Sequence, residues 1–108
     1  MDENELLTAS CDEGCPVRKT AAIIEGKWTT LIIRDLLSGK KRYSELLKSL
    51  SGISPKVLAD RLRFLEGRKI IARKIYPTVP PKTEYRLTDL GLQLKDVIMA
   101  MGVFGQNL

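Results

Sequence analysis

Two groups of residues in this sequence could do chemistry: basic side chains near its middle and two cysteines near its start. Lys56 and Arg63 stand in the segment SPKVLADRLRFLE at a spacing that places both on one face of a helix. From such a face they can reach base edges in the major groove of DNA, and Ser54 can donate to a phosphate or a base. These residue types therefore indicate a surface that binds nucleic acid.

The remaining residue types do not favour catalysis. The 108 residues include no histidine, which removes the commonest general base and the commonest metal ligand. The glycines in GKW and SGKK lack the strand and the glycine spacing of a phosphate-binding loop. We therefore predict that the chain is not an enzyme and that it uses no cofactor and no metal ion.

Cys11 and Cys15 form the second group, in the segment CDEGCP. Cys15 stands just before Pro16, next to a predicted helix amino terminus, and two basic residues follow within the first turn. The helix dipole and these cations stabilise a thiolate, whereas the acidic residues between the cysteines oppose it. Two interpretations stay open: a thiol at Cys15 that senses oxidants or electrophiles, with Cys11 able to resolve it, or an inert and partly buried thiol.

Charge is distributed unevenly along the chain. From Lys40 to Arg86 there are 13 lysines and arginines against 4 acidic residues, a net charge of +9, whereas the rest of the chain carries −4. A basic middle between acidic ends is typical of a chain that presents one surface to a polyanion. Nucleic acids and anionic membrane surfaces both fit this description, so the charge alone does not identify the partner.

Length and hydropathy predict one domain with its own core. A chain of 108 residues with 44% hydrophobic residues needs no disulfide or metal support. No apolar run approaches the roughly 20 residues that span a bilayer, and the acidic amino terminus lacks the regions of a signal peptide. We therefore expect a cytoplasmic protein with no membrane partner.

The apolar periodicity predicts which elements position the basic residues. Residues 1–14 lack a helical period and are expected to include a mobile tail. A helix is predicted from Pro16 until Gly26. A second helix, from Lys27 until Gly39, is apolar nearly all round and is therefore expected at the centre of the core.

A helix-turn-helix is predicted next. A short helix over residues 43–50, with Ser44 as its expected cap, is followed by a tight turn and by a helix that begins at Ser54 and Pro55. Two helices joined by three or four residues are the arrangement in which the second helix enters the major groove. The side chains of this second helix predicted to point inward are Leu58, Leu62 and Leu65. Those predicted to point outward are Lys56, Ala59, Asp60 and Arg63.

The segments IIARKIY and EYRLT predict a hairpin after this helix. The loop PTVPPKT between them contains three prolines, which favour a stiff extended path, so the hairpin can reach a DNA backbone as a wing. We assign Lys82, Arg42 and Arg86 to phosphate contacts, which set the register without reading sequence. The predicted DNA-binding residues are thus Arg42, Ser44, Ser54, Pro55, Lys56, Ala59, Asp60, Arg63, Lys82 and Arg86.

The last predicted helix begins at Thr88, which can cap it, and carries two apolar stripes. The first stripe consists of Leu90, Leu94, Val97, Ile98 and Met101. The second consists of Leu92, Met99 and Val103. One stripe is enough to dock on a domain of this size, so the second argues for a homodimer, with wrapping by the rest of the same chain as the alternative.

These elements predict an α+β, mostly helical fold: a single winged helix-turn-helix domain over residues 15–108, with a two-stranded wing and flanking N- and C-terminal dimerisation helices. The segments CPVRKTAAIIEGKW, LLSGKKRYSEL, GISPKVLADRLRFLE and YPTVPPKTEYRLTDLG, with the amphipathic helix that follows, resemble the HxlR-type family of winged helix-turn-helix transcriptional regulators, close to the MarR group. The resemblance runs from about Cys15 to the C-terminus.

The resemblance implies a homodimer held by its N-terminal and C-terminal helices. Such a dimer binds a two-fold operator in double-stranded DNA, with the helix from Ser54 in the major groove and the wing near Lys82 on the backbone. The resemblance also implies a candidate sensor thiol at Cys15, because the cysteine of the CP motif responds to oxidants, quinones or other electrophiles in several members.

This sequence departs from the family pattern at three positions. Tyr43 stands where phenylalanine is common, a change of little consequence. Lys69 stands where a glycine often precedes the first wing strand, so that turn is expected to differ. Cys11 is not part of the family pattern.

The resulting hypothesis is a dimeric, sequence-specific transcriptional regulator, more a repressor than an activator, whose affinity for DNA changes when Cys15 is modified. One alternative is a winged-helix protein-interaction module that binds no operator. Another is a regulator gated by a small molecule, in an apolar pocket at the dimer junction lined by Trp28 and neighbouring aliphatic side chains.

Overall fold

The computed structural model describes residues 1–8, 10, 12 and 14–108, which form helices and a small antiparallel sheet. The helices are α1 (Glu3–Thr8), α2 (Pro16–Ile24), α3 (Lys27–Leu37), α4 (Tyr43–Ser49), α5 (Pro55–Gly67), α6 (Asp89–Leu92) and α7 (Lys95–Gly105). The strands are β1 (Lys41–Arg42), β2 (Ile71–Tyr76) and β3 (Lys82–Leu87), which pair in the order β1-β3-β2. The predicted mostly helical α+β fold is confirmed.

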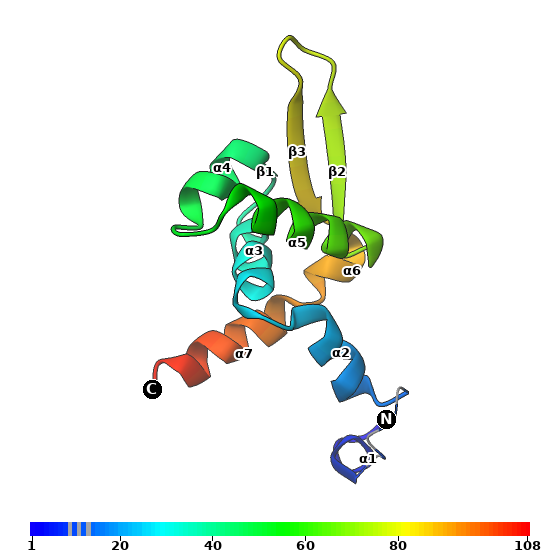
Figure 1. Ribbon diagram of the computed structural model, residues 1–108. Coiled ribbons are helices and arrows are strands. Elements are labelled where there is room, and N and C mark those ends of the chain that lie inside the picture. The colour runs from blue at the N-terminus through cyan, green and yellow to red at the C-terminus, as the bar shows by residue number, and fades with distance from the viewer. Residues whose placement is uncertain (9, 11, 13) are drawn as a thin grey trace.

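The elements gather at two ends of an elongated molecule. Helices α4 and α5 and the long β2–β3 hairpin lie at one end, and α1, α2, α7 and both termini lie at the other (Figure 1). Helix α3 joins the two ends and contacts α2, α5, α7 and β3. The helix-turn-helix and the wing therefore project away from the terminal helices.

The core forms where α3 meets α5 and the sheet. Helix α3 is central, as its all-round apolar sequence predicted, and Ile32 and Ile33 are fully buried. From α5, Leu58, Leu62 and Leu65 point into this core, as predicted from their helical spacing. The inward stripe fixes the rotation of α5 and so determines which of its side chains face outward.

Both ends of α5 are stabilised by local signals. The Ser54 hydroxyl accepts a hydrogen bond from the Val57 N–H at 3.1 Å, and Pro55 occupies the first helical position. At the other end Lys69 has a φ of 62°, and the Ile70 N–H donates to the Leu65 carbonyl at 3.0 Å. This bond closes a Schellman motif, so the turn keeps the left-handed conformation that glycine adopts most easily.

The start of the helix-turn-helix differs from its prediction in two respects. Helix α4 begins at Tyr43, and Glu45 accepts the Arg42 N–H at 2.9 Å, so Ser44 lies inside the first turn and is not the cap. The segment Lys41–Arg42 is the strand β1, which pairs with Tyr85 and Glu84 of β3. The two-stranded wing is therefore part of a three-stranded sheet.

The predicted C-terminal helix is divided into α6 and α7. Thr88 caps α6 as expected, because its hydroxyl accepts the Gly91 N–H at 3.1 Å. Of the first predicted stripe Ile98 is buried, and Leu94 and Val97 are half-buried, while Leu90 and Met101 are 50% and 44% exposed. The prediction that this stripe packs inward is therefore wrong for Leu90 and Met101.

Helix α1 was not indicated by apolar periodicity. Its first turn is stabilised by Asp2, whose carboxylate accepts the Glu5 N–H at 2.8 Å, and none of its residues is buried. The mobile tail of residues 1–14 and the single domain of residues 15–108 stay predictions. Across the described residues, no helix has the length and apolar character needed to cross a membrane.

Candidate nucleic-acid interface

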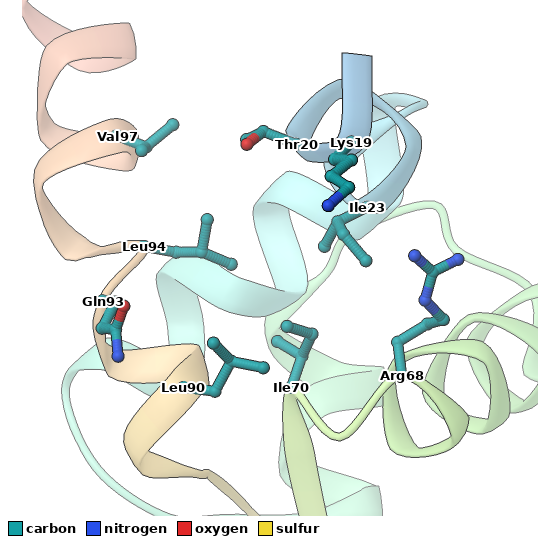
Figure 2. Close-up of a pocket in the computed structure, with 9 residues that line it drawn as sticks. All are labelled: Lys19, Thr20, Ile23, Arg68, Ile70, Leu90, Gln93, Leu94 and Val97. Carbon is teal, nitrogen blue, oxygen red and sulfur yellow. The ribbon is translucent and has the colours of Figure 1, made fainter. Parts of the chain in front are cut away.

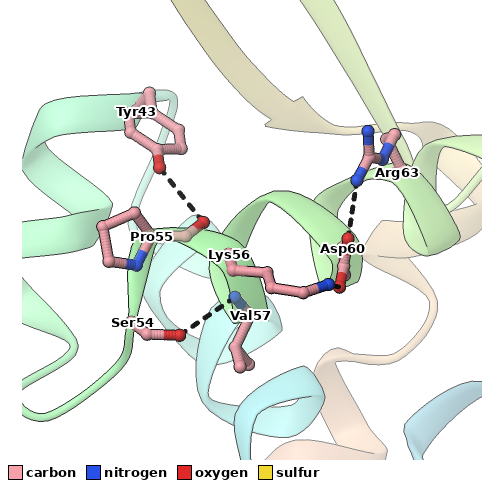
Figure 3. A network of polar contacts seen from close by, with 7 residues as sticks. All are labelled: Tyr43, Ser54, Pro55, Lys56, Val57, Asp60 and Arg63. Atoms are coloured by element: carbon pink, nitrogen blue, oxygen red, sulfur yellow. Dashed lines mark hydrogen bonds and ion pairs between the residues drawn. The ribbon is translucent and has the colours of Figure 1, made fainter.

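The outer face of α5 carries a group of three charged side chains, Lys56, Asp60 and Arg63, which we call the α5 triad. The Lys56 Nζ lies 3.2 Å from Asp60 Oδ2, and the Arg63 Nη2 lies 2.6 Å from Asp60 Oδ1 (Figure 3). The Lys56 and Arg63 side chains are 85% and 73% exposed. Both predicted base-contacting cations thus face outward, and one carboxylate joins them.

Asp60 is charged at neutral pH in this arrangement. The hydrogen bond from Arg63, and then that from Lys56, hold the pKa of Asp60 below its ordinary value. The helical spacing predicted that Asp60 points outward with Lys56 and Arg63. The structure places it on the same face as both cations.

The first turn of α5 is tied to α4. The Tyr43 hydroxyl donates to the Pro55 carbonyl at 3.3 Å, while the Ser54 hydroxyl caps the helix (Figure 3). Ser44 is exposed on α4, and Ala59 is half-buried on α5. Phenylalanine could not make the Tyr43 bond, so the hydroxyl connects the two helices through a contact that a phenyl ring lacks.

Two predicted phosphate ligands meet beside the wing. Arg42, from β1, and Lys82, from β3, line one hollow of about 310 Å³. Its other lining residues are Tyr76, Thr78 and Glu84. Two cations and the one carboxylate of Glu84 give these lining residues a net charge of +1, which favours a backbone phosphate. Arg86 is exposed elsewhere on β3 and lies outside this hollow.

Arg61, on α5, is a further basic residue that was not among those predicted to contact DNA. Its guanidinium lies 5.4 Å from the centre of the Phe64 ring, and it borders a hollow of about 330 Å³ with Trp28 and Asp60. Its position in the basic run RLR of α5 is the sequence signal that could have indicated a role in binding DNA. The helical spacing, however, placed it on neither the inward nor the outward face. Within the single chain, Trp28 borders a hollow that charged residues also line, and the expected apolar pocket at a dimer junction stays a prediction.

An apolar groove of about 620 Å³ lies between α2 and the α6–α7 region (Figure 2). Aliphatic side chains provide most of its lining: Ile23, Ile70, Leu90, Leu94 and Val97. Polar groups complete it: Lys19, Thr20, Arg68 and Gln93. The groove lies at the end of the molecule opposite the wing, and Trp28 is not part of it.

Cys15 occupies the position just before the first residue of α2, as predicted. Its side chain is buried, with 9% exposure, and its N–H donates to the Asp12 carbonyl at 3.0 Å. Cys11 lies outside the described residues. Among the residues that the structure describes, no three His, Cys, Asp or Glu side chains gather as a metal site would require.

Comparison with known proteins identifies the family. The family described as HxlR-like helix-turn-helix matches residues 23–108, which include the helix-turn-helix, the wing and α7. This chain belongs to the HxlR-like helix-turn-helix family.

Relatives of this HxlR-like protein cover most of its length. The HTH-type transcriptional regulator YdeP of Bacillus subtilis (strain 168) is 44% identical over 95 residues, which are 88% of this chain and 74% of that protein. A solved MarR-family regulator from Porphyromonas gingivalis W83 superposes with a TM-score of 0.86 at 46% identity, covering 90% of this chain and 95% of that one. The redox regulator HypR in its oxidized form gives 0.81 at 36% identity, covering 87% and 97%.

These relatives decide the broad class. Because the family and its named relatives are helix-turn-helix transcriptional regulators, this HxlR-like chain is a DNA-binding regulator and not an enzyme. The resemblance seen in the sequence motifs is thereby confirmed.

Proposed function

We propose that this protein is a homodimeric transcriptional repressor that binds a two-fold operator in double-stranded DNA. The observation that carries the proposal is that the α5 triad and the hollow of Arg42 and Lys82 lie at the same end of the molecule, the end that bears the wing. Cations on a recognition helix can contact base edges, while cations beside a wing contact phosphates. One end of the protein therefore supplies both kinds of contact.

The roles of individual cations follow from their positions. Lys56 and Arg63 are expected to contact bases, and Arg42, Lys82 and Arg86 to contact phosphates. Lys56→Ala and Arg63→Ala should therefore relax base preference. Lys82→Ala should weaken binding to all sequences alike and flatten the salt dependence by about one unit, measured by fluorescence anisotropy over a salt series. A changed preference among operators in Lys82→Ala would contradict this division.

Homodimer formation is supported by the terminal helices. In α7, Met99, Val103 and Phe104 are 58%, 61% and 66% exposed, although all three are apolar. A second copy that covers them would place two recognition helices in one assembly. For a symmetric dimer the distance between these helices must match about one turn of DNA or a multiple of it.

Control by Cys15 is the second part of the proposal. Support comes from its place at the start of α2, at the same end as α7, and from the solved relative HypR, which is named a redox regulator. Because Cys15 is only 9% exposed, an added group requires the start of α2 to move. Such a movement would alter the distance between recognition helices and weaken binding.

The deciding experiment is selection of bound DNA from a random pool, with and without a thiol oxidant such as diamide. We expect one two-fold sequence to be enriched without oxidant, and its enrichment to fall with oxidant. Cys15→Ser should keep the same sequence and lose the oxidant effect. An unselective pool under both conditions would reject the operator. Weak, salt-dependent and sequence-blind binding would favour the protein-interaction module instead.

The groove between α2 and the α6–α7 region favours a second candidate function, a regulator gated by a small molecule (Figure 2). Its volume of about 620 Å³ lies within the usual range of ligand pockets, and its aliphatic lining suits an apolar ligand. The test is a variant with Cys15→Ser and Cys11→Ser together. Loss of operator binding on addition of a ligand to this variant would support gating by the groove over thiol chemistry.

A further inference from the structure

Asp60 is among the predicted DNA-binding residues, but no specific contact has been assigned to it, although its carboxylate lies between the two cations assigned to base contact. One of its oxygens is 3.2 Å from the Lys56 Nζ, and the other is 2.6 Å from the Arg63 Nη2 (Figure 3). An acid on a face that meets a polyanion opposes binding to every phosphate. Its presence between two cations therefore requires an explanation other than affinity.

We propose that Asp60 is a specificity-determining residue, which positions Lys56 and Arg63 for base contacts and weakens binding to DNA that offers only phosphates. This proposal rests on the proposed function, because it assumes that α5 faces DNA. In this proposal Asp60 acts through Lys56 and Arg63 and makes no direct contact with a base.

The positioning part follows from the geometry of the guanidinium group. Arg63 presents five N–H donors in a fixed fork, and the bond from Nη2 to Asp60 uses only part of them. The remaining donors can still approach the O6 and N7 acceptors of guanine. Because Asp60 already holds the side chain, less conformational entropy is lost when the base contact forms.

The weakening of phosphate binding follows from charge. The α5 triad carries a net charge of +1, where its two cations alone would carry +2. A phosphate is repelled by the Asp60 carboxylate while the two cations attract it, whereas a neutral guanine can accept from the free donors of Arg63 without that repulsion. For each phosphate contact, affinity for DNA varies with the salt concentration raised to a power of about −0.9. One more cation that is available for a phosphate therefore raises affinity roughly eightfold at 0.1 M salt.

Direct reading of cytosine is the rival role for Asp60. A carboxylate can accept a hydrogen bond from the amino group of cytosine, and an exposed Asp60 could reach one. In the structure both carboxylate oxygens already accept from cations, which favours the indirect role. The two roles predict different responses to loss of the negative charge, so one set of variants separates them.

The experiment measures binding of the full chain to a random-sequence duplex and to the selected operator, over a series of salt concentrations. Asp60→Asn should raise affinity for the random duplex roughly eightfold at 0.1 M salt and steepen its salt dependence by about one unit. The ratio of operator affinity to random-duplex affinity should fall by at least the same factor. Asp60→Glu, which keeps the charge, should stay close to the unaltered protein.

Asp89→Asn is the matched control, because it removes the same charge from an exposed acid on α6. An equal rise in that variant would mean that only overall charge matters, and would overturn the proposal. Unchanged affinity of Asp60→Asn for the random duplex would also overturn it. Loss of preference at a single cytosine would establish the rival role. The random-duplex measurement tests the role of Asp60 even if no operator is selected. Failure to select an operator would count against the proposed function and not against the role of Asp60.

Discussion

At the scale of single residues, Lys69 has a backbone conformation that its side chain disfavours. Its φ is 62°, in the left-handed region, at the C-terminal end of α5. For residues other than glycine, this backbone region costs about 1–2 kcal/mol. Glycine avoids that cost, but it also makes the unfolded chain more flexible, which offsets part of the gain in stability. Lys69→Gly is therefore expected to raise the free energy of unfolding by roughly 0.5–1 kcal/mol in a urea titration.

Lys69→Ala is the control for this prediction. It removes the same charge and most of the same side chain, but it keeps the Cβ atom that makes the left-handed region unfavourable. No comparable gain is expected. Equal stabilisation by both substitutions would show that the charge, and not the backbone, limits stability at this turn.

At the scale of secondary-structure elements, the two helices of the helix-turn-helix begin in different ways. The Ser54 hydroxyl caps α5, so Ser54→Ala should lower the free energy of unfolding by about 1 kcal/mol. Ser44 lies inside α4, whose first turn is closed by Glu45 and the Arg42 N–H. Ser44→Ala should therefore change stability by less than about 0.5 kcal/mol. Similar losses in both variants, in matched urea titrations, would contradict this assignment.

The close approach of α6 to the start of β2 depends on a glycine. A Cβ atom at Gly91 would lie 2.1 Å from the Ile70 carbonyl oxygen. Because Gly91→Ala forces α6 away from this backbone, it should cost about 1–3 kcal/mol in thermal or urea unfolding. Gly67→Ala is the matched control, since no atom lies within 4 Å of its added Cβ. A neutral result at Gly91 would mean that α6 adjusts without losing contacts.

At the scale of the whole molecule, the terminal helices and the wing occupy opposite ends (Figure 1). Analytical ultracentrifugation is expected to show a dimer. Met99→Glu should shift it toward monomer and weaken operator binding, because a charge would be buried in the interface. Val79→Glu places the same charge at the wing, where the side chain is fully exposed, and should leave the dimer intact. Dissociation by both variants would exclude an interface at α7.

Local sequence signals predicted most of the helices because capping and apolar spacing depend on near neighbours. Pro16 and Ser54 mark the starts of α2 and α5, and three leucines fix the inward face of α5. The same signals did not predict β1, because Lys41–Arg42 becomes a strand only by pairing with β3, far along the chain. They also failed at Ser44, where Glu45 closes the first turn instead.

The outward direction of Lys56 and Arg63 was determined by the sequence itself, because the period of a helix and its buried leucines leave only one face for them. Family membership was likewise readable from the motifs. Only the tertiary structure decided that Arg42 and Lys82 share one hollow and that most apolar side chains of α7 stay exposed, because both depend on which distant segments of the chain meet. The spacing of three and four residues along α5 makes the two ion pairs of Asp60 possible. That both form at once depends on side-chain rotamers, which the spacing does not specify.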